Sequence, residues 1–260
     1  MLDLSHLKWD NFKQNSPVSD GTLPKCQDGD TYYKLSSGDD YSGFYGHESL
    51  NECIVSDILD GLNIPHVKYS GSMAKVTVWD KTYETFACWS KEFKNPGERS
   101  QSFEKFYQSK CLKNEDAFDF CKRLGFEEYA LLCFVVDYLI INRDRHRANI
   151  EVLTCSEGVR LTPLFDHGLS LIAPLTNRDS DIGMFDAMLS REVNNFIGSK
   201  FLEVNLQYIQ SPIAVNPISV VDVVWPYKEF MSSNRFFKTI EILDRRYHYL
   251  LEEGYICEKV

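Results

Sequence analysis

The sequence predicts an α+β fold in two lobes, a strand-rich front followed by a helix-rich back. Three observations lead to this expectation. Runs of β-type residues gather within the first 90 residues around one helical stretch, and helical patterns dominate from residue 100 onward. Between them lies the polar stretch 91–100, which contains Pro96-Gly97 and has the composition of a boundary. We therefore expect one domain made of an N-lobe, residues 1–92, and a C-lobe, residues 93–260.

The front part is expected to hold one helix among strands. Asp28-Gly29 is a turn signal, and the β-rich run Thr31–Leu35 follows it. Residues 48–60 are apolar on most sides of a helix, which predicts a buried helix with Gly61 at its left-handed C-terminal position. Two further strands are expected at 74–79 and 82–89, and loops at 16–25 and 36–46.

The back part is expected to be mainly helical with one hairpin. Helical patterns cover residues 100–110, 114–123 and 127–141, and a closing amphipathic helix spans Ser233–Glu252, capped by Ser233 or Asn234. Two β-type runs, 150–154 and 159–162, are separated by a segment of hairpin-loop length. Residues 174–200 show no clear element.

Composition excludes several classes of function. The net charge of -10 argues against nucleic-acid binding, which needs a basic face, and against docking on an anionic membrane. The eight cysteines are scattered singly, which indicates reduced thiols in a cytoplasmic protein. The N-terminus lacks a signal-peptide pattern, and the longest apolar run stops at Asp137, too short to span a bilayer.

The strongest local signal is an apolar segment that ends abruptly in a polar loop. After Ile141, residues 142–149 (the polar loop) supply almost only hydrogen-bonding or charged side chains. Asp144 and Asn149 are five residues apart, the separation of catalytic base and metal-binding Asn in kinases. The expected hairpin returns the chain to its starting point, so Asp166 should lie beside Asn149. The base Asp144, the amide of Asn149 and the carboxylate of Asp166 are then expected to lie close together.

Three interpretations of this cluster are open. A metal hydrolase would need His167 as an additional ligand, and a structural network would use Asn and Asp as loop caps. In a phosphoryl-transfer enzyme, Asp144 would accept the proton of the acceptor hydroxyl, while Asn149 and Asp166 would hold Mg²⁺. The spacing and the hairpin favour phosphoryl transfer.

The basic residues around this cluster admit more than one role. The alternating arginines Arg143, Arg145 and Arg147 would either neutralise phosphates or form a solvated charge cluster, and both interpretations stay open. Lys34 ends a strand, and either Glu48 or Glu52 on the next helix is a candidate partner. A surface lysine with two solvated glutamates is the alternative.

The motifs resemble those of the HipA-like serine/threonine kinases. The polar loop is similar to the family's N-x-D-x-H-x-x-N sequence, and residues 163–166 resemble its P-[LI]-[YF]-D metal motif. Looser similarities are Ser19–Lys25 to its Ser/Gly loop, residues 33–35 to its lysine strand, Asn51-Glu52 to its paired-Glu helix and residues 86–93 to its hinge segment. The chain resembles the compact, single-chain branch of the family, without the extra N-terminal domain of HipA itself. It departs from ordinary protein kinases in having Asp166-His167-Gly168 in place of D-F-G and no A-P-E.

The resemblance implies a protein-kinase-like two-lobe fold and transfer of the ATP γ-phosphate, with Mg²⁺, to a Ser or Thr hydroxyl. It further implies autophosphorylation on Ser16 or Ser19 of the 16–25 loop and an antitoxin-type protein partner. A small-molecule kinase and a nucleotide-binding pseudokinase are the alternatives. The implied residues are Asp144, Lys34 and Glu52 for catalysis, Asn149 and Asp166 for the metal, and Ser19, Gly21, Lys25, Lys34, Cys88, Trp89 and His146 for the nucleotide.

Overall fold

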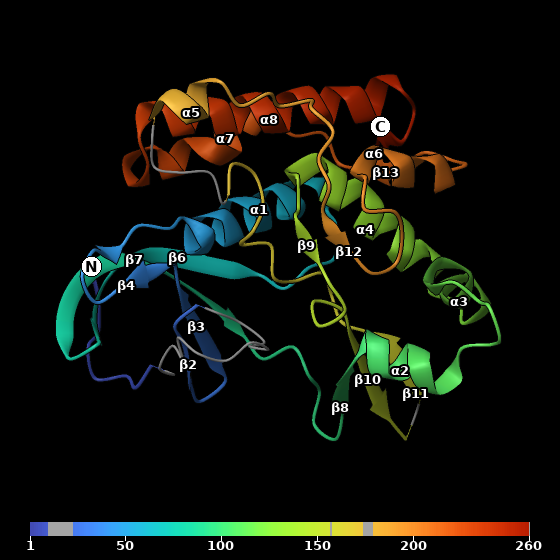
Figure 1. Ribbon diagram of the computed structural model, residues 1–260, viewed down its shortest axis with the longest axis horizontal. Coiled ribbons are helices and arrows are strands. Elements are labelled where there is room, and N and C mark those ends of the chain that lie inside the picture. The colour runs from blue at the N-terminus through green and yellow to red at the C-terminus, as the bar shows by residue number, and fades with distance from the viewer. Residues whose placement is uncertain (10–22, 157, 174–178, 260) are drawn as a thin grey trace.

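The computed structural model describes residues 1–9, 23–156, 158–173 and 179–259. Its N-terminal part is a five-stranded sheet in the order β1-β6-β7-β3-β2, and helices dominate the remainder (Figure 1). β1 is parallel to β6, and the other neighbours are antiparallel. The fold is therefore α+β, as predicted. The strands are β1 (Leu2–Leu4), β2 (Lys25–Asp28), β3 (Thr31–Leu35), β6 (Tyr69–Val78) and β7 (Lys81–Lys91), and β4 (Gly38–Asp39) pairs separately with β5 (Gly43–Phe44).

The long hairpin of β6 and β7 forms the middle of this sheet. Its two-residue turn is Trp79-Asp80, with φ values of 53° and 59°, between the paired residues Val78 and Lys81. Two successive positive φ values give the turn twist that matches paired strands. Both strands are longer than the sequence predicts, because every residue from 69 to 78 finds a partner on β7.

Helix α1 (Glu48–Leu62) is the expected buried helix, with most of its residues hidden from solvent. Its C-terminal end differs from the prediction. The left-handed residue is Asn63, with φ of 58° and ψ of 43°, and Gly61 is still helical. A Cβ at Gly61 would lie 2.9 Å from Ile218 Cγ2. Gly61 is thus needed for close packing against Ile218, while the Asn63 side chain tolerates the left-handed backbone.

The C-terminal part packs around one large apolar core. The buried faces of α4 and α8 contribute much of it, together with residues of α1. In Figure 1, α8 lies across the top of the molecule and α4 runs beneath it. The helices here are α2 (Phe103–Lys110), α3 (Ala117–Arg123), α4 (Glu127–Ile140), α5 (Asp179–Gly183), α6 (Leu202–Asn205), α7 (Val220–Val224) and α8 (Ser233–Glu252), with short 3₁₀ turns η1 (Leu206–Tyr208) and η2 (Trp225–Phe230).

The predicted hairpin is present as β10 (Glu151–Cys155) and β11 (Gly158–Leu161), and β8 (Arg99–Ser102) extends it to three strands. Two further pairs are parallel: β9 (Asp144–Arg145) with β12 (Asn194–Asn195), and β13 (Ile213–Val215) with β14 (Ile256–Glu258). The region predicted to lack regular structure thus contains α5 and β12. Helix α8 has the expected bounds, but Ser232 is its cap, since Ser232 Oγ accepts from Arg235 N at 3.3 Å.

All eight cysteines are free. No helix in the described part of the chain is long and apolar enough to cross a bilayer. The boundary expected between residues 92 and 93 stays a prediction.

Candidate functional site

The polar loop leaves α4 through a strained backbone position. Ile141 has φ of 51° and is fully buried. A β-branched residue rarely adopts this left-handed conformation, and such strain is typical of functional sites. Next, the buried side chain of Asn142 donates to Asp137 Oδ1 at 2.8 Å and accepts from Asp144 N at 3.3 Å. Asn142 therefore fixes the start of the loop to α4.

Asp144 lies at the rim of the loop, with a quarter of its side chain exposed. Its Oδ1 accepts from Asn194 Nδ2 at 3.1 Å, across the β9–β12 pair. Its Oδ2 is 3.8 Å from His146 Nε2. His146 also organises the loop, because its Nδ1 accepts from the amides of Ala148 and Asn149 at 3.2 Å. One carboxylate oxygen of Asp144 is thus oriented by a neutral donor, and the other faces no close hydrogen-bond donor among the described residues.

Asn149 and the Asp166 segment are brought together as the sequence predicts. The Asn149 side chain is buried and donates from Nδ2 to the carbonyl of Asp144 at 2.8 Å, so its own oxygen points elsewhere. Arg145 Nη1 donates to the carbonyls of Asn149, at 3.3 Å, and Phe165, at 3.0 Å. The guanidinium of Arg145 therefore holds Asn149, at the end of the polar loop, close to Phe165, the residue before Asp166.

That guanidinium belongs to a buried ion pair for which the sequence analysis assigned no role. Arg145 and Asp137 are 1% and 0% exposed, and Arg145 Nη2 lies 2.8 Å from Asp137 Oδ1. Nη2 also lies 3.3 Å from Nδ1 of the buried His167. Burial disfavours charged Arg145, but attraction to Asp137 outweighs it and raises the pKa of Arg145. An acidic residue inside an apolar helix was the available sequence signal, since such a charge needs a partner.

The three alternating arginines have separate environments. Arg145 is the internal brace just described, and the exposed Arg147 pairs with Glu104 Oε1 at 2.7 Å. Arg143 is half-buried. Neither interpretation of the three arginines as one group describes them, because successive residues of this irregular loop face different neighbours.

Lys34 bridges α1 and the Asp166 segment. Its Nζ lies 2.9 Å from Glu52 Oε1 and 2.7 Å from Asp166 Oδ1. Glu52 Oε2 accepts from His167 N at 2.8 Å, which ties the same carboxylate to the residue after Asp166. Glu48, the other candidate partner, accepts instead from the backbone N of Ser37 at 3.0 Å and from its hydroxyl at 2.5 Å.

The charges of Lys34, Glu52 and Asp166 shift one another's pKa values. Burial acts to lower the pKa of Lys34. The negative charges of Asp166 and Glu52 outweigh this effect and raise the pKa well above its usual range. Burial acts to raise the pKa of Asp166, but the charge and hydrogen bond of Lys34 hold it at about 2. Burial raises the pKa of Glu52 despite the opposing charge of Lys34. Asp166 is therefore a permanent anion at neutral pH, with 38% of its side chain exposed.

A third connection between α1 and this segment comes from Asn51, which the sequence analysis assigned only to the start of the helix motif. Its Nδ2 donates to the carbonyls of Gly168, at 2.9 Å, and Ser170, at 3.1 Å. Together with the bond from His167 N to Glu52, this fixes the helix against residues 167–170.

The other predicted nucleotide residues are more dispersed. Ser16, Ser19 and Gly21 lie outside the described residues. Lys25 begins β2 and lies opposite Lys34 in the ladder. Cys88 is buried in β7, opposite Lys34 on one side and Gly71 on the other, and Trp89 follows it in the same ladder. The backbone of residues 88–89 is therefore part of the sheet.

The donor set suits a hard divalent cation. Within the described ranges, no three His, Cys, Asp or Glu side chains form a metal-binding group. Mg²⁺, however, needs only one or two protein oxygen ligands beside phosphate oxygens and water. Asp166 supplies an ionised, partly exposed carboxylate, and Asn149 supplies an amide whose nitrogen is already used. These two residues fit Mg²⁺ and lack the nitrogen and sulfur ligands that Zn²⁺ prefers.

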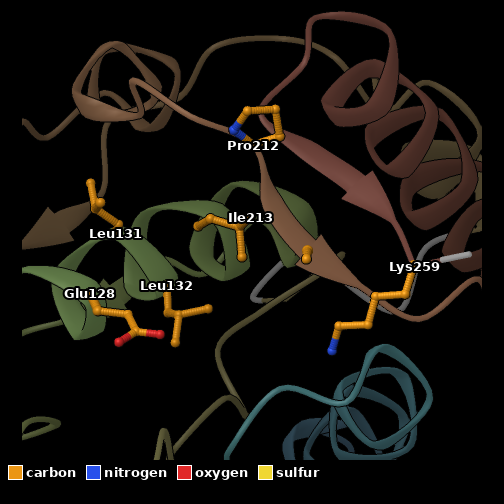
Figure 2. A pocket seen from close by; sticks show the side chains of 7 residues that line it. Glu128, Leu131, Leu132, Pro212, Ile213 and Lys259 are labelled. Atoms are coloured by element: carbon orange, nitrogen blue, oxygen red, sulfur yellow. The ribbon is translucent and has the colours of Figure 1, made fainter.

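A separate hollow of about 410 Å³ lies between α4 and β13 (Figure 2). It has a mainly apolar lining and contains none of the predicted site residues. Its lining residues are Glu128, Leu131, Leu132, Pro212, Ile213, Ala214 and Lys259.

Comparison with known proteins bears on the fold. No protein-family model and no curated protein matches the sequence. Among solved structures, the proinflammatory kinase CtkA of Helicobacter pylori matches with a TM-score of 0.62 and 14% identity, over 98% of this chain and 96% of that one. HipA of Shewanella oneidensis MR-1, solved with HipB and operator DNA, matches with a TM-score of 0.48 and 13% identity, over 95% of this chain and 68% of that one. The chain therefore has the HipA-like kinase fold that its motifs predict.

Proposed function

We propose that this protein transfers the γ-phosphoryl group of ATP, with Mg²⁺, to a serine or threonine hydroxyl. The observation that carries the proposal is the Lys34 bridge between Glu52 and Asp166, joined through Arg145 to the loop that presents Asp144. Phosphoryl transfer depends mainly on positioning and charge stabilisation. This chemistry requires a fixed cation, an ionised carboxylate for the metal and a partly exposed carboxylate as the base. Lys34, Asp166 and Asp144 are the candidates for these three groups.

The surroundings of each residue support the role proposed for it. Lys34 is held by two carboxylates and carries a full charge toward the nucleotide phosphates. Asp144 has a carboxylate oxygen without a close hydrogen bond from the described residues, and this oxygen accepts the proton of the acceptor hydroxyl. Asn149 and Asp166 would hold Mg²⁺, which would supply neutralisation of charge on the transferred phosphoryl group. The Asn142 bond to Asp144 N keeps the base in register with α4.

The strand pairing of β7 supports a position for the adenine. Because residues 88–89 are paired on both sides, adenine is expected to take its backbone hydrogen bonds near the end of β7, at Lys91 and beyond. The contribution of Cys88 and Trp89 is then contact with the ring, and His146 acts by ordering the polar loop.

Two single variants test the mechanism. Asp166→Ala removes a metal ligand, so Mg-ATP affinity measured by calorimetry should fall together with transfer. Asp144→Ala removes the base, so Mg-ATP affinity should stay while transfer to a protein falls by about 10²–10⁴-fold. Full transfer activity in either variant contradicts the assignment. ATP binding without any transfer by the unaltered protein identifies a pseudokinase, and transfer only to small hydroxyl compounds identifies a small-molecule kinase.

Autophosphorylation in residues 16–25 and an antitoxin-type partner belong to the same proposal. A phosphoserine carries nearly two negative charges, and the resemblance assigns the 16–25 loop to the ATP phosphates, so phosphorylation of Ser16 or Ser19 is expected to oppose nucleotide binding. Mass spectrometry after incubation with Mg-ATP locates the phosphate. Phosphate only outside residues 16–25 contradicts this regulation and leaves the kinase assignment intact.

A further inference from the structure

Arg143 in the polar loop and Arg191 after it carry buried donors without an acceptor among the described residues. Nε and Nη2 of Arg143 and Nε of Arg191 are shielded from solvent, and each lacks a hydrogen-bond partner there. Neither guanidinium forms a salt bridge within the described part of the chain. Five other arginines have carboxylate partners, in the pairs Arg145–Asp137, Arg147–Glu104, Arg160–Glu98, Arg123–Glu115 and Arg245–Glu241. Buried charged donors without a partner are costly, so those of Arg143 and Arg191 require a reason.

The two guanidiniums act on each other unfavourably. Burial lowers the pKa of Arg143 to about 10, and the positive charge of Arg191 acts in the same direction. Arg191 stacks on Phe185, with its guanidinium carbon 4.1 Å from the ring centroid, and its Nη2 donates to the carbonyl of Asp186, at 3.4 Å. The segments that carry the two arginines lie side by side, since β12 pairs with β9 and Asn194 N donates to the carbonyl of Arg143 at 2.9 Å.

A third arginine adds to the positive field without occupying the same donors. Arg246 is buried and donates to the carbonyls of Ala187, at 2.6 Å, and Tyr138, at 2.8 Å. Its pKa is lowered by burial and by Arg191, while Glu203 and Asp186 oppose the effect. Glu203 and Asp186 therefore offset part of the effect of burial on Arg246.

We propose that Arg143 and Arg191 form a binding site for a phosphoryl group, carried by free phosphate or by a phosphate monoester. Two guanidiniums supply about two positive charges, which match the charge of nearly −2 on a phosphate monoester. Guanidinium forks donate pairs of parallel hydrogen bonds to such an oxyanion. A phosphoryl group would therefore satisfy the unpaired donors and remove the repulsion in one step.

The site lies next to the proposed base and uses none of the residues proposed to hold ATP. Arg143 precedes Asp144; its amide donates to the carbonyl of Leu169 at 3.1 Å, and its carbonyl accepts from Asn194 N at 2.9 Å. The Asn194 side chain in turn contacts Asp144. An anion held by both arginines would join the segment of residues 185–195 to the polar loop at this point. The site would thus couple phosphoryl binding to the order of the loop that carries Asp144.

The test compares thermal unfolding in inorganic phosphate and in chloride at equal ionic strength. Phosphate at low millimolar concentration should raise the Tm of the unaltered protein. Arg143→Gln and Arg191→Gln should each abolish the rise, whereas Arg245→Gln, at an exposed arginine of α8, should keep it. In chloride alone Arg143→Gln should unfold no earlier than the unaltered protein, because it removes an unpaired buried charge. A merely structural role for Arg143 predicts the opposite, an earlier unfolding in both salts.

Calorimetry with inorganic phosphate gives a second measure that does not depend on Tm. Loss of a charge-assisted pair should weaken phosphate binding by about 10-fold or more in Arg191→Gln. O-phosphoserine distinguishes the sources: binding at least as tight as that of inorganic phosphate indicates a side-chain phosphoryl group, and tighter binding of inorganic phosphate indicates a free anion. Equal effects of phosphate on all variants, or no effect on any, would overturn the proposal. Neither measurement requires transfer activity, so failure of the proposed kinase function is seen separately.

Discussion

The buried ion pair of Arg145 and Asp137 allows the sharpest prediction about stability. Both side chains are inaccessible to solvent, and Arg145 also donates to the carbonyls of Asn149 and Phe165. Removing one member of a buried pair leaves an uncompensated charge and costs about 3–5 kcal/mol. We therefore expect Asp137→Leu to lower the free energy of unfolding by this amount. With unfolding entropy scaled to 260 residues, the Tm should fall by about 5–9 °C.

The double variant Asp137→Leu with Arg145→Met separates charge from packing. Removing both charges leaves no buried ion, although the carbonyls of Asn149 and Phe165 lose a donor, at about 1–3 kcal/mol each. The double variant should therefore be markedly more stable than the sum of the two single changes predicts. Arg147→Met is the matched control, since its exposed pair with Glu104 contributes about 0–1 kcal/mol.

Urea unfolding followed by circular dichroism measures these free energies. The reasoning fails if Arg145→Met costs no more than Arg147→Met, or if the two single changes simply add. A loss of transfer activity in Arg145→Met at temperatures where it is folded would further show that the brace positions the polar loop.

Three further predictions concern the site. Glu52→Gln should weaken Mg-ATP binding in calorimetry more than Glu48→Gln, because Glu52 contacts Lys34 whereas Glu48 contacts Ser37; the reverse order would contradict the pairing. The pKa of Asp166 is depressed from 3.8 to about 2, so the stability it contributes is present above about pH 4 and lost as the pH falls toward 2; urea midpoints of Asp166→Asn should show a flatter dependence in that window, and parallel curves would refute it. Asn194→Ala should lower kcat by about ten-fold with little change in the KM for ATP, because it removes the side-chain donor that orients Asp144 Oδ1; a change confined to KM would assign Asn194 to binding.

Local patterns were sufficient to predict several elements and their order. The β-rich run Thr31–Leu35 became β3 with the same bounds, and Ser233–Glu252 became α8. The helix that ends in the polar loop and the hairpin that returns toward Asp166 were predicted because periodicity and turn composition are properties of adjacent residues. The resulting convergence of Asn149 and the Asp166 segment follows from hairpin geometry.

The predictions of helix ends were less accurate, because tertiary packing influences where a helix ends. Gly61 has the composition of a C-terminal left-handed residue, but packing against Ile218 requires a residue without a side chain at this helical position. The residue with the left-handed backbone conformation is therefore Asn63. At α8, Ser232 and Ser233 are equivalent by composition, and only the backbone conformation selects Ser232 as the cap.

The partners of the site residues depended on the tertiary structure. Glu48 and Glu52 share a helix face, so their spacing alone could not show which of them pairs with Lys34. In the folded chain Glu48 accepts a hydrogen bond from Ser37, and Glu52 forms the ion pair with Lys34. Asn194 approaches Asp144 from 50 residues away through the β9–β12 pair. The sequence by itself determined which residue types reach the site and in what order, because those are local properties of the chain. Only the folded chain decided which charges are paired, since a charge buried among distant segments is stable only where their packing brings an opposite charge to it.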